Sequence, residues 1–221
     1  MNIFDNFSEQ ALSTAYHYDS WANSYDRDVS EEFSYEAHKK VAEAVREYAC
    51  ADAINILDLG TGTGLVLQEL KPAFSKASMT GLDASIQMLD KQRSKYLGTR
   101  LQHCDIGSND WPVPENHFDI VTCAGTLSLI PDLNHVLDQT RKAARTGATI
   151  AMSFLIGTEQ RKDHFLAEIF DGTRIYQRTP SEMRQAVEKH GFKVHKTPDI
   201  FIGYAGQTFR EYHGVIAFIK N

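Results

Sequence analysis

Apolar residues along the chain follow two alternating patterns, which predict strands alternating with helices. Short apolar runs between turn residues are typical of buried strands, and apolar residues three and four apart are typical of helices. The runs predict strands over residues 54–59, 78–83, 100–104, 118–123, 149–156, 192–196 and 215–219. The amphipathic stretches predict helices over residues 64–74, 85–96, 131–144, 159–170 and 180–190. This order favours an α/β fold, a mostly parallel sheet with helices on both faces.

Several helix ends have their own local signals. Ser85 is a suitable N-cap for the second of these helices, and Pro131 occupies the tolerated first turn of the third. Gly191 follows the last one, where a C-cap glycine is expected. The final two strands have no long helix between them, which predicts that one edge of the sheet is antiparallel.

The first fifty residues differ in composition from the rest. They are rich in Tyr, Ser, Asp and Glu, and end in the amphipathic stripe of Val41, Ala42 and Val45. We therefore expect an N-terminal helical segment at 1–50 and a core domain at 51–221, with an insertion around 157–180.

Composition places the chain among ordinary globular proteins. It has 221 residues, of which 42% are apolar and 24% charged, enough for one domain with an appendage. The net charge of −6 disfavours a general grip on nucleic acid phosphates. No apolar run is long enough to cross a bilayer and no signal peptide is apparent, so we expect a cytoplasmic protein with no membrane partner.

Cysteine and histidine usage argues against metal or disulfide chemistry. The three cysteines, Cys50, Cys104 and Cys123, form no C-x-x-C pair, and we expect them to be small, mostly buried apolar residues. The nine histidines show no H-E-x-x-H or similar clustering, so we expect no metal site.

The sharpest motif is Asp58-Leu-Gly-Thr-Gly-Thr-Gly64, which joins the first strand to the following helix. Its glycines permit a tight turn and close approach of a ligand at the carboxyl end of the strand. A dinucleotide fingerprint would need a third glycine at position 65 or 67, and both positions are leucine. A P-loop is excluded because no Gly-Lys-Ser/Thr follows.

This D-x-G-x-G-x-G pattern resembles the first motif of class I S-adenosylmethionine-dependent methyltransferases. Gly81-Leu-Asp83-Ala-Ser85 resembles their acidic second-strand motif, and Asp83 lies 23 residues after the first glycine. Cys104-Asp105-Ile106 resembles the adenine-binding motif, and Trp111 to Asp119 resembles the proline-rich approach to the fourth strand. Lys142 to Ala148 departs from the family turn in this region because it keeps one glycine and lacks the proline.

The resemblance implies a Rossmann-like sheet of seven strands in the order 3-2-1-4-5-7-6, with the last strand antiparallel. It implies S-adenosyl-L-methionine as cofactor and S-adenosyl-L-homocysteine as product. In the core domain, the implied cofactor-binding residues are Asp58, Gly60, Thr61, Gly62, Gly64, Asp83, Ala84, Met88, Asp105, Ile106, Ala124 and Gly125.

A dense aromatic segment precedes the core. Tyr18-Asp-Ser-Trp21-Ala-Asn-Ser-Tyr25-Asp resembles the Tyr-Asp-x-Trp-Ala-x-x-Tyr-Asp segment of many small-molecule methyltransferases, including the Williams–Beuren-region methyltransferase-like type. The resemblance implies a lid over the methionine end of the cofactor, to which Tyr18, Trp21 and Tyr25 would contribute. Aromatic faces attract a sulfonium cation. The alternative is that this helical face only packs on the core.

The sequence carries less information about the methyl acceptor than about the cofactor. Candidate acceptor-side residues are His164, Tyr176 and Tyr204. His164 has the chemistry of a general base, although a surface histidine on a helix is the favoured interpretation. Motifs of nucleobase, cytosine-C5 and arginine methyltransferases are absent from the sequence. Methyl transfer depends mainly on positioning, so we assign no catalytic residue.

The leading hypothesis is methyl transfer to an oxygen or nitrogen of a small molecule, by a monomer or homodimer that is not expected to bind nucleic acid. An RNA or protein methyltransferase is the first alternative, and its footprint would be a basic rim of Lys142, Arg145, Arg161, Lys162, Arg174 and Arg178. A catalytically silent cofactor-binding module is the second, since a fold and a cofactor site do not fix a reaction. A nicotinamide dehydrogenase is remote because the glycine spacing fails.

Overall fold

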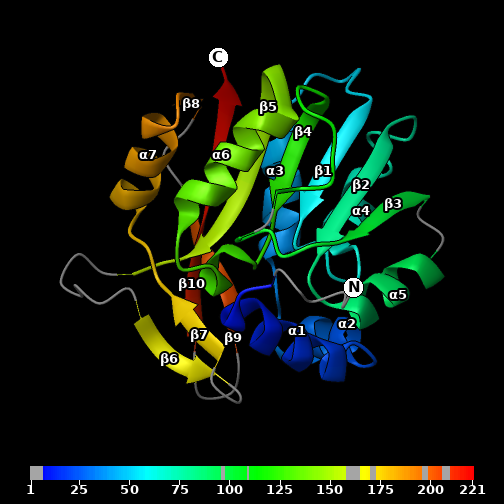
Figure 1. Ribbon diagram of the computed structural model, residues 1–221, viewed down its shortest axis with the longest axis vertical. Helices are drawn as coiled ribbons and strands as arrows, with labels where there is room; N and C mark the ends of the chain where they lie inside the picture. The colour runs from blue at the N-terminus through cyan, green and yellow to red at the C-terminus, as the bar shows by residue number, and fades with distance from the viewer. Residues whose placement is uncertain are drawn as a thin grey trace.

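The structure is a computed structural model, and it describes residues 7–95, 98–108, 110–157, 165–169, 173–195, 199–205 and 210–221. Its centre is a twisted sheet of eight strands (Figure 1). The strands are β1 (Asn55–Leu59), β2 (Ser78–Asp83), β3 (Thr99–His103), β4 (Phe118–Cys123), β5 (Ala144–Leu155), β8 (Phe192–Val194), β9 (Asp199–Ala205) and β10 (Arg210–Lys220).

The main path of the sheet runs β3-β2-β1-β4-β5-β10-β8, and β9 also pairs with β10. The first five strands of this path are parallel, and β10 is antiparallel to both β5 and β8. This confirms the predicted mostly parallel sheet with an antiparallel strand. The predicted count of seven strands is wrong by one, and the order differs from the predicted one at β9. The addition is β9, which pairs antiparallel with the first half of β10.

Helices cover both faces of the sheet. The helices are α1 (Glu9–Trp21), α2 (Tyr25–Arg27), α3 (Ala37–Tyr48), α4 (Leu65–Leu70), α5 (Ile86–Ser94), α6 (Leu133–Ala143) and α7 (Pro180–Lys189), with a π-helical turn η1 (Asp28–Glu32) and a 3-10 turn η2 (Leu127–Leu129). Ser85 caps α5 as predicted, because its hydroxyl accepts from the Met88 N–H at 3.1 Å.

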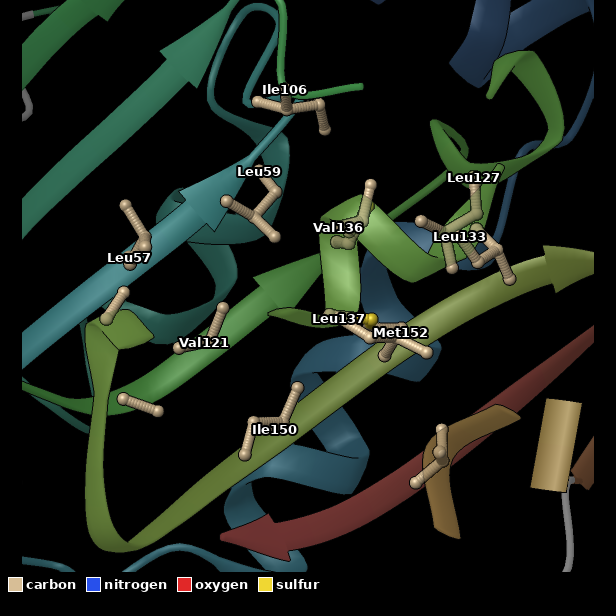
Figure 2. Close-up of a cluster of buried hydrophobic side chains, with 14 of the residues drawn as sticks. Leu57, Leu59, Ile106, Val121, Leu127, Leu133, Val136, Leu137, Ile150 and Met152 are labelled. Carbon is tan, nitrogen blue, oxygen red and sulfur yellow. The ribbon is translucent and has the colours of Figure 1, made fainter. Parts of the chain in front are cut away.

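The period-two pattern of the strands divides the core into two layers. Leu57, Val121 and Ile150 face α6 and α7, in the cluster shown in Figure 2. Neighbouring strand residues such as Ile56 and Ile120 face α3 and α4 on the other side. Central strands such as β1 and β4 are therefore mostly buried, whereas β3 at the edge of the sheet is only partly buried and mostly polar.

One predicted helix is wrong in the part that the structure describes. The residues expected to form a helix at 159–170 include β6 (Phe165–Ile169), which pairs antiparallel with β7 (Thr173–Tyr176). The sequence between these strands contains Asp171-Gly172, a pair enriched in β-hairpins, and this signal outweighs helical periodicity in so short a segment.

The N-terminal helices lie at one end of the sheet. Figure 1 places α1 and α2 beside α5, at the end where the β6–β7 pair and β9 are also found. The third helix, α3, instead packs on the sheet through Val41, Ala42 and Val45. Of the expected segment 1–50, the part before α3 is therefore the part that lies over the strand ends.

Candidate cofactor-binding site

The turn after β1 is built by glycines in the left-handed region. Gly60, Gly62 and Gly64 have φ values of +62°, +54° and +88°, which side-chain-bearing residues rarely adopt. A Cβ at Gly60 would lie 2.1 Å from Thr126 Oγ1, whereas a Cβ at Gly62 would meet no atom within 4 Å. The turn is therefore closed behind Gly60 and open toward a ligand at Gly62.

Asp83 connects this turn to the end of β2. Its Oδ2 accepts from the Gly62 N–H at 2.7 Å, and its Oδ1 accepts from the Ser85 N–H at 2.8 Å. Burial raises the pKa of Asp83, and these two backbone donors oppose the rise. The side chain is thereby fixed as a hydrogen-bond acceptor at the edge of the turn.

Asp105 occupies the corresponding place after β3. Its Oδ1 accepts from the Gly107 N–H at 2.8 Å, and its Oδ2 accepts from the hydroxyls of Ser108 at 2.5 Å and Ser8 at 2.9 Å. Ser8 is also the N-cap of α1. The predicted adenine-side carboxylate is thus joined directly to the N-terminal helix.

The aromatic residues of the N-terminal segment form one cluster. The ring centroids of Trp21 and Tyr25 are 4.8 Å apart, and Tyr18 lies 6.0 Å from Trp21 and 6.1 Å from Tyr25. The indole N–H donates to Asp28 at 2.8 Å. All three rings line the same cavity as Gly62 and Asp83, an arrangement suited to a cationic ligand.

Two aspartates in the same sequence motif attach this segment to the core. Asp19 accepts from the Ser85 hydroxyl at 2.5 Å and the Gln87 N–H at 3.0 Å, at the N-terminus of α5, where a carboxylate is favoured. Asp26 accepts from the Thr63 hydroxyl at 2.5 Å and pairs with Lys95 at 2.6 Å. The sequence analysis assigned no role to these aspartates.

The cavity between the N-terminal segment and the strand ends has a volume of about 750 Å³. Twelve of the predicted cofactor-binding residues line it, namely Tyr18, Trp21, Tyr25, Gly60, Gly62, Asp83, Ala84, Met88, Asp105, Ile106, Ala124 and Gly125. Residues that are scattered over more than a hundred positions of sequence are therefore brought to one surface.

Asp58, Thr61 and Gly64 lie behind this surface. The Asp58 Oδ1 accepts from the Thr122 hydroxyl at 2.7 Å, and burial raises the pKa of Asp58 to about 7. The Thr61 hydroxyl donates to Gln92 at 3.1 Å, and Gly64 packs against the same glutamine. These three residues support the turn from within the core.

The predicted acceptor-side residues are not brought together in the described structure. Tyr176 does not line the cavity, and its neighbour Ile175 does, because adjacent residues of β7 face opposite sides. His164 lies outside the described residues. The backbone of Tyr204 belongs to β9, and its side chain lies outside the described part.

The structure adds residues that the sequence analysis missed. Glu211 and His213, two apart on β10, and Tyr35, before α3, all line the cavity. The available signal for the first two was the period-two spacing of a strand. The predicted strand began at residue 215, so its first half was overlooked.

The comparisons with known proteins agree with this geometry. Residues 56–147 match the family described as "Methyltransferase domain". Over 82% of its length, the chain superposes on 96% of an S-adenosylmethionine-dependent methyltransferase from Mesorhizobium loti, with a TM-score of 0.64 and 16% identity. The fold is that of a Rossmann-like methyltransferase. The cofactor that this family and such neighbours imply is S-adenosylmethionine.

Curated relatives match over part of their length. The chain is 36% identical to human Methyltransferase-like protein 27 over 114 residues, which is 50% of this chain and 45% of that protein. It is 31% identical to the ubiquinone/menaquinone biosynthesis C-methyltransferase UbiE of Desulfotalea psychrophila over 94 residues, 42% of this chain and 37% of that protein. The chain thus spans less than half the length of these two relatives.

Other expectations concern metals, cysteines and membranes. The described residues contain no cluster of three or more metal-binding side chains. Cys104 and Cys123 are buried as predicted, but Cys50 is exposed, because it lies in the loop between α3 and β1. In the described part of the chain, no helix is long and apolar enough to cross a bilayer.

Proposed function

We propose that this chain binds S-adenosylmethionine in the cavity and transfers its methyl group to a small molecule. The observation that carries this proposal is the continuity of the cavity. It joins the glycine turn, Asp83 and Asp105 to residues on β5 and β10, so two ligands can meet inside it.

The residues present fit the cofactor. Gly62 leaves open space where a side chain would intrude, and Asp83 presents a fixed carboxylate that can accept from ribose hydroxyls. Asp105 is placed to accept from the adenine amino group, beside the apolar Ile106. When bound, the cofactor supplies an electrophilic methyl group on a sulfonium.

In this proposal the N-terminal segment acts as a lid. Tyr18, Trp21 and Tyr25 present aromatic faces to the cavity, and the anchors at Asp19 and Asp26 hold these faces over the strand ends. Such a cover excludes water and attracts a cation. The chain's contribution to catalysis is then positioning within a dry pocket, which can supply about 7–11 kcal/mol of a barrier.

A small acceptor is favoured over RNA or protein. Arg178, which was expected in a basic rim, is buried and donates to the carbonyls of Leu127 at 2.8 Å and Ile130 at 2.5 Å. Lys142 and Arg145 are paired with nearby aspartates. Arg161 and Lys162 lie outside the described residues, and Arg174 is exposed. Three of the four rim residues that the structure describes therefore have partners within the chain.

We propose oxygen or nitrogen as the methylated atom. The relative named as a C-methyltransferase shows that carbon belongs among the acceptors to be tested. The cytoplasmic location and the monomeric or homodimeric state also remain proposals.

A turnover assay tests the proposed function. Purified protein is incubated with S-adenosylmethionine and a panel of small amines, phenols and quinols, and S-adenosylhomocysteine is quantified by mass spectrometry. The proposal predicts product above the acceptor-free control for at least one acceptor, and loss of that product in Asp83→Ala. Cofactor binding with no turnover across the panel would instead favour a silent binding module.

A further inference from the structure

The ionisable side chains of the cavity are strongly biased in sign. Five carboxylates line it, those of Asp28, Glu32, Asp83, Asp105 and Glu211. Among the lining residues of the described chain there is no lysine or arginine. A carboxylate or phosphate ligand would meet like charge here with no lysine or arginine partner among the described lining residues, which is costly in a partly buried site.

Glu211 is placed apart from the proposed cofactor contacts. The proposed cofactor contacts Asp83 and Asp105 lie at the ends of β2 and β3, whereas β10 lies beyond β5 in the sheet. In the antiparallel β5–β10 pair, His213 is opposite Leu155, the last residue of β5. The start of β10 therefore lies beside the carboxyl ends of the parallel strands, next to the cofactor region and outside it.

The Glu211 side chain is held near a buried imidazole. His213 Nε2 lies 3.7 Å from Glu211 Oε2, and the exposed fractions of the two side chains are 4% and 36%. A Cβ at Gly203 of β9 would lie 2.1 Å from His213 Cδ2, so the imidazole packs on a position where only glycine fits. The pair is thus seated on the sheet rather than on a loop.

The charges of these groups also act on Tyr18, which lines the same cavity. Burial, followed by the charges of Asp83 and Glu211, raises the pKa of Tyr18 to about 12. The Tyr18 phenol therefore senses both the cofactor-side carboxylate and the carboxylate on β10. A cation placed between them would be favoured by the same field.

Apolar side chains also line this cavity. Leu155 of β5, which pairs with His213 in the sheet, and Ile175 of β7 both line it. An apolar wall with one carboxylate suits a ligand that has a hydrophobic body and one positive group.

We propose that the acceptor site binds an amine with an apolar body as its ammonium ion, and that Glu211 is the carboxylate that recognises it. This substrate class rests on the proposed function and narrows it to nitrogen acceptors. Because an ammonium nitrogen has no lone pair, the bound ion would first give one proton to the Glu211 carboxylate, and the neutral amine nitrogen would then form the bond to the methyl group as the bond from that group to sulfur breaks. It assigns Glu211 to specificity, with His213 positioning its carboxylate.

Binding of matched probes tests the inference without requiring turnover. Protein saturated with S-adenosylhomocysteine is titrated calorimetrically with phenethylamine, 2-phenylethanol and 3-phenylpropionate, which share an aromatic body and differ in charge. We expect phenethylamine to bind at least about tenfold more tightly than 3-phenylpropionate. In Glu211→Gln, which keeps the shape of the side chain, this preference should fall by about fivefold or more.

The control variant is Glu31→Gln, which removes an exposed carboxylate of η1 that does not line the cavity and should leave the preference within about twofold. Equal or tighter binding of 3-phenylpropionate by the wild-type protein would overturn the inference. So would absence of phenethylamine binding at millimolar concentration, or equal losses in the two variants. Retained S-adenosylhomocysteine affinity shows that each variant is folded, whereas failure of the wild-type protein to bind this product refutes the proposed function itself.

Discussion

Replacing Asp58 by asparagine should remove a large pH dependence of stability. The Asp58 carboxyl group is buried in the core, two residues before the glycine turn begins in the sequence, and its Oδ1 accepts from the Thr122 hydroxyl at 2.7 Å. Burial raises its pKa from 3.8 to about 7. Asparagine keeps the size and the acceptor oxygen but cannot ionise, so the substitution isolates the charge.

The sign follows from the direction of the change. A carboxyl group whose pKa is higher in the folded state binds its proton more tightly when folded, so its contribution is fully present below pH 3.8 and is lost as the pH rises toward 7. A difference of about three pH units corresponds to about 4 kcal/mol. The free energy of unfolding of the wild-type protein should therefore fall by about this amount, relative to Asp58→Asn, between about pH 4 and pH 8.

Urea denaturation of both proteins across this pH range, followed by circular dichroism, measures the difference. Subtracting one curve from the other removes the contributions of the remaining ionisable groups, which both proteins share. Parallel stability profiles would refute the reasoning, because they would show that Asp58 ionises in the folded protein as it does in water.

Three further predictions concern the lid and the strand ends. Asp26→Asn should weaken the attachment of the N-terminal segment by only about 1 kcal/mol, because the Asp26 side chain is 41% exposed and solvent weakens its ion pair. Limited proteolysis should then cut the segment before α3 faster than in the wild-type protein, and an unchanged cleavage rate would show that Asp26 does not anchor the segment. Gly125→Ala should destabilise the fold by about 2–3 kcal/mol in thermal denaturation, since φ is +75° and the new Cβ would lie 2.3 Å from Tyr35 Oη. Tyr35→Phe in the same chain should recover part of that loss, and a strictly additive double variant would contradict the clash. Tyr25→Ala should lower the affinity for S-adenosylmethionine, measured by calorimetry, severalfold. A lower melting temperature with unchanged affinity would show that Tyr25 only packs against the core.

Much of the fold was predictable because it depends on local patterns. Strands such as β1 and β4 are buried on both faces and consist mostly of apolar residues, so their positions are clear from the sequence. The glycine turn and Asp83 were also predictable from local patterns, because their spacing along the chain determines where they lie at the ends of β1 and β2.

The rest depends on contacts that one sequence does not reveal. The helix at 159–170 was predicted wrongly because apolar residues have helical spacing in this short segment, and the nearby Asp171-Gly172 pair, which favours a β-hairpin, was not considered. Glu211 was missed because the antiparallel pairing of β10 with β5 is what brings the start of the last strand to the cavity. In the sequence alone, Asp19 and Asp26 look like solvent-exposed charged residues, because their contacts with Ser85 and Thr63 appear only in the folded structure.

Calorimetric titration with S-adenosylmethionine, S-adenosylhomocysteine and NAD tests the central claim most directly. The account predicts dissociation constants on the order of micromolar for the first two ligands, no measurable binding of NAD, and at least about a tenfold loss of affinity in Asp83→Ala. Binding of NAD instead, or unchanged affinity for S-adenosylmethionine in Asp83→Ala, would show that the cavity at the glycine turn does not hold this cofactor.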